Sequence, residues 1–219
     1  MKFMDEVIAY SKEAWDDAAN ERFLNEMADG TLSREKFRDY MVQDSIYLRD
    51  YLKTFAYAMA KSRSWKEMQL FYSMLGYVTD GENTTRLTYL AEWGLTDADI
   101  DKIEKRPQCR DYTSFLIETG KNGTVEEILM AVLPCLLGYY DVFMRLKARA
   151  PLVAEGYFAP LVADYTSEGY GECCAYWTEL ANEMCGGFDK TTKEHLKEIF
   201  YLASMHELHF WQMAGEERR

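Results

Sequence analysis

Three side chains in this sequence could carry out nucleophilic and acid–base chemistry, although they lie far apart along the chain. Asp44 and Glu207 are acids in the middle of apolar helical repeats, and Cys135 is a thiol in a third such repeat. A thiolate is a strong nucleophile even when only a small fraction of the thiol is ionised. A carboxylic acid whose pKa is raised by burial can donate a proton near neutral pH.

Each of these residues interrupts a stripe whose spacings alternate between four and three, which places the stripe on one face of a helix. The stripes are Phe37, Met41, Asp44, Leu48, Tyr51, Phe55; Ile128, Val132, Cys135, Tyr139, Val142, Leu146; and Leu196, Phe200, Ala203, Glu207, Phe210, Ala214. Such faces should point to the core, where an ionised carboxylate is costly unless it is paired. No Lys or Arg occurs in the three stripes. A ligand could therefore be the missing partner.

A purely structural explanation is open for each residue taken alone. A buried carboxylate can bond a tyrosine or tryptophan, and a free cysteine often serves as a small buried hydrophobe. Tyr139 lies one turn after Cys135, and Tyr47 lies one turn after Asp44, yet aromatic residues at helical spacing usually belong to a core. The combination of a thiol, two carboxylates and several tyrosines on inward faces favours a site.

The elements that carry these residues are predicted to be helices throughout. Nearly every segment has helical periodicity, and none shows sustained alternation with a period of two. The expected helices cover residues 2–18, 20–29, 33–62, 64–92, 96–105, 109–120, 124–149, 157–165, 168–185 and 190–214. Because no linker or repeat divides the chain, residues 1–219 are expected to form one all-α domain, a compact helical bundle.

Capping residues support these boundaries. The expected N-caps are Ser33, Thr96, Thr124 and Ser167, and the expected C-caps are Gly30, Gly94, Gly120 and Gly186 with Gly187. Glu127 follows Thr124 by three residues, as in a capping box. Pro134 lies inside a helical pattern, so a kink is expected there.

Charge and hydropathy limit the kinds of partner. The net charge of −12 disfavours nucleic acid and anionic membranes. The N-terminus lacks the apolar segment of a signal peptide, and the longest uncharged apolar stretch, residues 128–140, is too short to span a bilayer. These features predict a soluble, cytoplasmic protein.

Cysteines and histidines give no pattern for a metal or a disulfide. The five cysteines are odd in number and contain no C-x-x-C, and Cys109 is expected to be exposed. No histidine forms the Glu-x-x-His motif of a bundle di-iron site, and none lies in the first helices, where a haem ligand would be needed. No metal and no cofactor are therefore predicted.

Four groups of residues resemble the TenA/thiaminase II family, and their order and spacing extend from about residue 10 to residue 213. They are residues 42–48 (VQDSIYL), 133–135 (LPC) with Tyr139, 164–168 (DYTSE) and 203–211 (ASMHELHFW). The resemblance implies a haem-oxygenase-like helical bundle without haem. Cys135 is similar to the nucleophile of the cysteine-containing subgroup. Family members are commonly tetramers, so a homotetramer is expected.

The resemblance also implies an activity, the hydrolysis of an aminopyrimidine in thiamin salvage. The substrate would be an aminomethyl-pyrimidine, converted to the hydroxymethyl-pyrimidine, or thiamin itself. Cys135 would attack the ring, and Glu207 would exchange a proton with a ring nitrogen. Asp44 would bind the exocyclic amino group. The remaining site residues implied are tyrosines: Tyr47 and Tyr112 for ring stacking, and Tyr139 and Tyr165 for the thiol or the substrate.

Some positions depart from the family pattern. Leu136 and Leu137 follow the cysteine where aromatics are frequent, and His206 precedes Glu207 where tyrosine is frequent. These departures leave the preferred leaving group open. Two other functions also stay open: a haem-oxygenase-like bundle oxidase that uses a metal or a quinone, and a non-catalytic protein that binds pyrimidines or regulates through a partner.

Overall fold

In a computed structural model of the chain, which describes residues 2–80 and 83–217, helices and loops account for all of the described backbone. The predicted all-α class is confirmed. The helices are α1 (Phe3–Tyr10), α2 (Lys12–Ala19), α3 (Arg22–Ala28), α4 (Arg34–Lys61), α5 (Trp65–Asp80), α6 (Asn83–Glu92), α7 (Asp97–Ile100), α8 (Pro107–Asn122), α9 (Val125–Arg149), α10 (Ala159–Tyr165), α11 (Glu168–Cys185) and α12 (Lys190–Gly215), with a short 3₁₀ helix at Pro151–Ala154.

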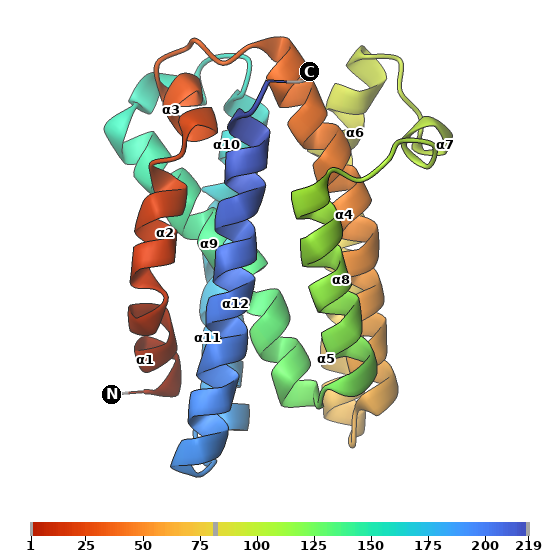
Figure 1. The fold of residues 1–219 in the computed structure, drawn as a ribbon, viewed down its shortest axis with the longest axis vertical. Helices are drawn as coiled ribbons and strands as arrows, with labels where there is room; N and C mark the ends of the chain where they lie inside the picture. Colours follow the sequence, from red (N-terminus) through yellow and green to blue (C-terminus); the bar gives the residue numbers. More distant parts are fainter. Residues whose placement is uncertain (1, 81–82, 218–219) are drawn as a thin grey trace.

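The long helices form a bundle (Figure 1). The helices α1, α2 and α3 follow one another along one edge, α12 lies beside them, and α4 lies on the opposite side next to α8. The central element is α9, which packs against α12, α11, α4 and α8. It is long and apolar enough to cross a membrane by length and composition, but 67% of its most apolar segment is buried within the bundle. In this structure α9 is a core helix.

Most of the capping residues predicted from the sequence are confirmed. Ser33, Thr96, Thr124 and Ser167 each accept a hydrogen bond from a backbone amide of the first turn, and Thr124 with Glu127 forms a complete capping box. Gly30 and Gly94 have φ angles of +71° and +66°, which suit glycine after a helix end.

Several helix boundaries differ from the prediction. The segment 2–18 divides at Ser11, and the segment 96–105 contains only one short helix. The segment 64–92 forms α5 and α6, and its middle, residues 81–82, lies outside the described residues. Gly120 was predicted as a C-cap but lies inside α8. A Cβ at this position would come within 2.7 Å of the Tyr57 ring, so Gly120 permits close packing of α8 against α4.

The three stripes face the interior as predicted. On α4 and α9 the stripe residues are buried except for Leu48 and Cys135, which are partly buried, and every stripe residue of α12 is buried. Burial of each large apolar side chain contributes about 1.5–3 kcal/mol. Both Asp44 and Glu207 are therefore held in the core by the apolar residues around them, with 6% of each exposed.

A buried amide fixes the register of the loop before α8 against α4. Gln43 donates from Nε2 to the carbonyl oxygen of Glu104 (3.1 Å), and its Oε1 accepts from the Arg106 amide (2.8 Å). The Cys109 thiol donates to the Gln43 carbonyl oxygen (3.6 Å). Cys109 is thus fully buried, and its predicted exposure is wrong, because the thiol packs between α4 and α8. These contacts place α8 beside the turn of α4 that carries Asp44.

Replacing Gln43 with Leu should destabilise the bundle. The substitution leaves the Glu104 carbonyl and the Arg106 amide without their partner, which should lower the free energy of unfolding by about 2–5 kcal/mol. Urea denaturation measures this loss. The control is Gln212→Leu, which removes an exposed amide that donates to Glu21. It should change the free energy by less than about 0.5 kcal/mol. Equal effects of the two substitutions would contradict the anchoring role of Gln43.

Candidate active site

The structure brings Cys135 and Glu207 together across the interface of α9 and α12. The Cys135 thiol lies close enough to the Glu207 carboxyl group to favour the carboxylate form. The Tyr112 hydroxyl, from α8, donates to Oε1 of Glu207 at 2.7 Å. Residues that are 72 and 95 positions from Glu207 in the chain thus meet at one carboxyl group. This contact is possible because the stripes of α9 and α12 face each other.

Burial controls the ionisation of Glu207. Desolvation raises the pKa of its carboxyl group to about 8, and the charge of Asp44 acts in the same direction. Hydrogen bonds from Tyr112 and Cys135 favour the carboxylate but do not outweigh the burial. At neutral pH, Glu207 is therefore mostly protonated and can act as a proton donor.

Asp44 is a second acid in the same region. Burial raises its pKa to about 7, and the positive charge of Arg86 on α6 opposes this shift. Asp44 is therefore partly ionised near neutral pH. A cationic or hydrogen-bond-donating group beside Asp44 would favour its charged form. The site thus contains two acids whose pKa values both lie close to physiological pH, a property that is common at functional sites.

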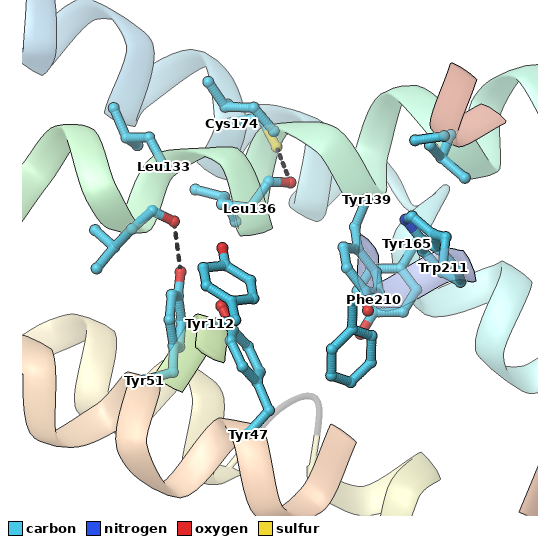
Figure 2. Packing of buried hydrophobic residues seen from close by; sticks show 14 of the residues in the cluster. Tyr47, Tyr51, Tyr112, Leu133, Leu136, Tyr139, Tyr165, Cys174, Phe210 and Trp211 are labelled. Atoms are coloured by element: carbon cyan, nitrogen blue, oxygen red, sulfur yellow. Dashed lines mark hydrogen bonds between the residues drawn. The ribbon is translucent and has the colours of Figure 1, made fainter. Parts of the chain in front are cut away.

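Aromatic rings surround the Glu207 carboxyl group. The Tyr112 ring lies 4.8 Å from the Tyr47 ring and is stacked on the His206 imidazole at 5.2 Å with an interplanar angle of 6°. Figure 2 shows Tyr47 and Tyr51 projecting from α4 toward α9, with Tyr112 beside them. The Tyr47 hydroxyl is buried near Tyr112 and meets no hydrogen-bond partner of good geometry among the described side chains. Stacking of Tyr47 and Tyr112 on a substrate ring stays a prediction.

Tyr139 and Tyr165 form a second pair of rings, and Tyr139 follows Cys135 by one turn on α9. Their rings are 4.8 Å apart, and Tyr139 also packs on Trp211 at 4.9 Å. The charges of Asp44 and Glu207 add to the effect of burial on the pKa of Tyr139, which rises well above 10. Tyr139 therefore belongs to the same cluster as both acids. Tyr165 borders this cluster through the Tyr139 ring, as Figure 2 shows.

Hydrogen bonds from side chains to backbone carbonyl oxygens hold the turn of α9 around Cys135. The Tyr51 hydroxyl donates to the carbonyl oxygen of Val132 at 3.2 Å. The Tyr170 hydroxyl and the Cys174 thiol both donate to the carbonyl oxygen of Leu136, at 3.2 and 3.7 Å. Figure 2 shows the bonds of Tyr51 and Cys174. Pro134 lies inside this turn, which is held from α4 by Tyr51 and from α11 by Tyr170 and Cys174.

The sequence did not predict the contributions of Tyr40, Tyr170 and Cys174 or the stacking role of His206. One signal was present for Tyr40, since Tyr40, Asp44, Tyr47 and Tyr51 follow a four-three-four spacing on α4. Tyr170 and Cys174 carried no comparable signal, because their partner is a backbone carbonyl of a distant helix.

A separate cleft of about 610 Å³ lies between α3, the start of α4 and the end of α12. Its walls contain none of the predicted site residues. Charged side chains along it pair with one another, as Lys36 does with Glu26 at 3.0 Å and Arg22 with Glu26. The combination of a thiol with acids of raised pKa occurs instead around Glu207, so we assign the candidate active site there.

Within residues 2–80 and 83–217, His, Cys, Asp and Glu side chains form no group of three or more that could hold a metal ion. Among the described residues the five cysteines are not joined in disulfides.

Comparisons with known proteins agree with the fold. The model of the TENA/THI-4/PQQC family matches residues 9–217. The chain is 27% identical over 218 residues to the aminopyrimidine aminohydrolase of Halalkalibacterium halodurans, covering 100% of this chain and 97% of the relative. A TenA homologue from P. horikoshii superposes with a TM-score of 0.88 at 24% identity, over 98% of each chain. A domain with a heme oxygenase-like fold from Shewanella denitrificans superposes with a TM-score of 0.74 at 13% identity, over 96% of this chain and 91% of that domain. The expected haem-oxygenase-like bundle is confirmed.

Replacing Glu207 with Gln should stabilise the protein at alkaline pH. In the unfolded chain the carboxyl group has an ordinary pKa near 4.5, whereas in the folded chain it is about 8. Unfolding thus releases a proton between these pH values, and the stability of the unsubstituted protein falls as pH rises through this window. Gln does not titrate, so its advantage should grow to about 2–4 kcal/mol above pH 8.

Thermal unfolding of both proteins at about pH 5.5, low in this window, and at about pH 8.5, above it, measures the difference in their stability. The control is Glu183→Gln, which replaces an exposed acid and should shift the unfolding temperature equally at both pH values. A Glu207→Gln variant whose relative stability does not change with pH would show that Glu207 is ionised at little cost in the fold.

Proposed function

Because this chain belongs to the TENA/THI-4/PQQC family, we propose that it is an aminopyrimidine aminohydrolase of the thiaminase II type that works in thiamin salvage. It hydrolyses an aminomethyl-pyrimidine to the hydroxymethyl-pyrimidine and ammonia, and it cleaves thiamin by the same chemistry. The name of its relative from Halalkalibacterium halodurans supports this activity. The observation that carries the proposal is the contact of the Cys135 thiol with the buried Glu207 carboxyl group.

In the first step, Cys135 adds to the pyrimidine ring while Glu207 moves two protons. The protonated Glu207 gives its proton to a ring nitrogen, which gains electron density as sulfur attacks. The resulting carboxylate then takes the proton of the neighbouring Cys135 thiol. The net result is a neutral adduct with a new carbon–sulfur bond and a proton on the ring. A pKa of about 8 suits Glu207 for both transfers, because it is close to that of an ordinary thiol.

In the second step, the adduct expels ammonia, or the thiazole in the case of thiamin, and leaves an exocyclic methylene group. Water adds to the methylene, and departure of the sulfur restores the aromatic ring. The overall change exchanges an amine for a hydroxyl group with one water consumed. Asp44 binds the exocyclic amino group of the pyrimidine, and Tyr47 and Tyr112 hold the ring. Tyr139 and Tyr165 form hydrogen bonds with the thiol or the substrate.

The protein is further proposed to be cytoplasmic and to assemble as a homotetramer. Exposed aromatic side chains support an interface on one side of the bundle. Trp65 is 80% exposed and Tyr72 is 67% exposed, and they lie two turns apart on the same face of α5. Light scattering on the purified protein measures the assembly.

Cys135→Ser should abolish hydrolysis without altering the fold. The hydroxyl group is a far weaker nucleophile than a thiolate at neutral pH, so turnover should fall by at least about 10²-fold. The assay incubates the protein with the aminomethyl-pyrimidine and with thiamin and measures the hydroxymethyl-pyrimidine formed from each. The control is Cys173→Ser, which replaces a partly buried thiol on a different helix, α11. Full hydrolysis by the Cys135→Ser variant would rule out covalent catalysis by this residue.

Glu207→Gln should lower kcat by roughly 10²–10⁴, the usual contribution of a positioned proton donor. Because the reactive form of Glu207 carries a proton, kcat/KM of the unsubstituted enzyme should fall as pH rises through about 8. The residual activity of the Gln variant should lack this alkaline decline. A pH–rate profile of both proteins measures it. If the decline persisted unchanged in the variant, a group other than Glu207 would be the acid.

A further inference from the structure

Tyr40 lies beside the candidate site, and it has none of the roles proposed for Tyr47, Tyr112, Tyr139 and Tyr165. It occurs on α4 one turn before Asp44 and is 1% exposed. Its ring is stacked on Trp211 at 5.5 Å with an interplanar angle of 16°, and it contacts Phe23 at 4.9 Å. Its hydroxyl donates to the hydroxyl oxygen of Tyr139 at 3.2 Å. The surrounding rings thus fix the direction in which this hydroxyl points.

The surroundings of Tyr40 keep it protonated. Burial raises the pKa of Tyr40 well above 10, and the charges of Asp44, Glu207 and Cys135 act in the same direction. The charges of all three reactive groups therefore act on the Tyr40 hydroxyl, which keeps its proton near neutral pH. It can serve as a permanent hydrogen-bond donor but not as a base.

The hydrogen bond from Tyr40 constrains Tyr139. A tyrosine hydroxyl has one hydrogen to donate. With the Tyr139 oxygen accepting from Tyr40, the hydrogen of Tyr139 is available to a different acceptor. Tyr139 lies one turn after Cys135 on the same face of α9, so this hydrogen can be directed to the sulfur or to a bound ligand beside it.

We propose that Tyr40 is a positioning residue that holds the Tyr139 hydroxyl with its hydrogen directed toward Cys135 and the bound pyrimidine. The inference rests on the proposed aminopyrimidine hydrolase function. Without Tyr40 the Tyr139 hydroxyl is free to rotate and to spend part of its time turned away from the reacting groups. Tyr40 therefore acts only through Tyr139, and this dependence distinguishes it from a residue that merely fills the core.

A double-mutant cycle tests this dependence. It compares the unsubstituted enzyme with Tyr40→Phe, Tyr139→Phe and the double variant, with kcat and KM measured for the aminomethyl-pyrimidine. Tyr40→Phe keeps the packed ring and removes only the hydroxyl. It should lower kcat about 3- to 10-fold, the contribution of one neutral hydrogen bond, and leave KM nearly unchanged. In the Tyr139→Phe background the same substitution should change kcat by less than about twofold.

A second measurement needs no turnover. The rate at which iodoacetamide alkylates Cys135, followed by peptide mass, should change in Tyr40→Phe but not further in the double variant. Tyr89→Phe is the matched control, since the buried Tyr89 hydroxyl donates to the Tyr157 carbonyl oxygen at 2.8 Å, away from the predicted site residues. This control should leave both kcat and the alkylation rate unchanged.

The two proposals can fail separately. Absence of hydrolysis by the unsubstituted enzyme would contradict the proposed function. If the unsubstituted enzyme is active, the inference about Tyr40 is overturned by any of three results: equal effects of Tyr40→Phe in both backgrounds, no effect on kcat, or an effect on KM alone.

Discussion

The structure depends on keeping a titratable cluster inside an apolar helical bundle. An ionised carboxylate in such a place costs several kcal/mol, and the protein avoids most of this cost by raising the pKa of the acid. Glu207, with a pKa of about 8, enters the fold as a neutral acid. The same burial that would destabilise its charged form therefore makes it a proton donor at neutral pH. Stability and reactivity have one physical cause here.

The helical period explains how distant residues reach this cluster. Each of α4, α9 and α12 contributes one reactive side chain from the middle of an inward stripe, and Asp44 and Cys135 both lie close enough to Glu207 to affect its pKa. The residues one turn away then surround them. Tyr47 on α4, Tyr139 on α9 and Trp211 on α12 are each three or four positions from the reactive residue of their helix. A regular repeat thus builds both the reactive groups and their aromatic surroundings.

Much of the fold and part of the site followed from the sequence for this reason. Periodicity and capping residues predicted the helices. Periodicity also predicted the inward faces of α4, α9 and α12 and the burial of Asp44 and Glu207. Periodicity could not show which side chain of α8 reaches Glu207, because the rotation of α8 is set by the contacts of Gln43 with the loop before it. The catalytic and binding roles of the residues, and the single domain spanning residues 1–219, stay predictions.

The side chain of His206 supports the reacting groups without contacting the Glu207 carboxyl group through a hydrogen bond. A ring at this position packs against Tyr112, and the imidazole of His206 does so in a nearly parallel stack. The Tyr112 hydroxyl still donates to Glu207 at 2.7 Å. What the bundle requires at this position is thus a flat side chain that keeps Tyr112 in place, and a histidine meets that requirement. Desolvation lowers the pKa of His206, so the imidazole remains neutral near pH 7 and adds no charge beside the buried acid. A histidine at this position therefore preserves the balance of burial and hydrogen bonding on which the acidity of Glu207 depends.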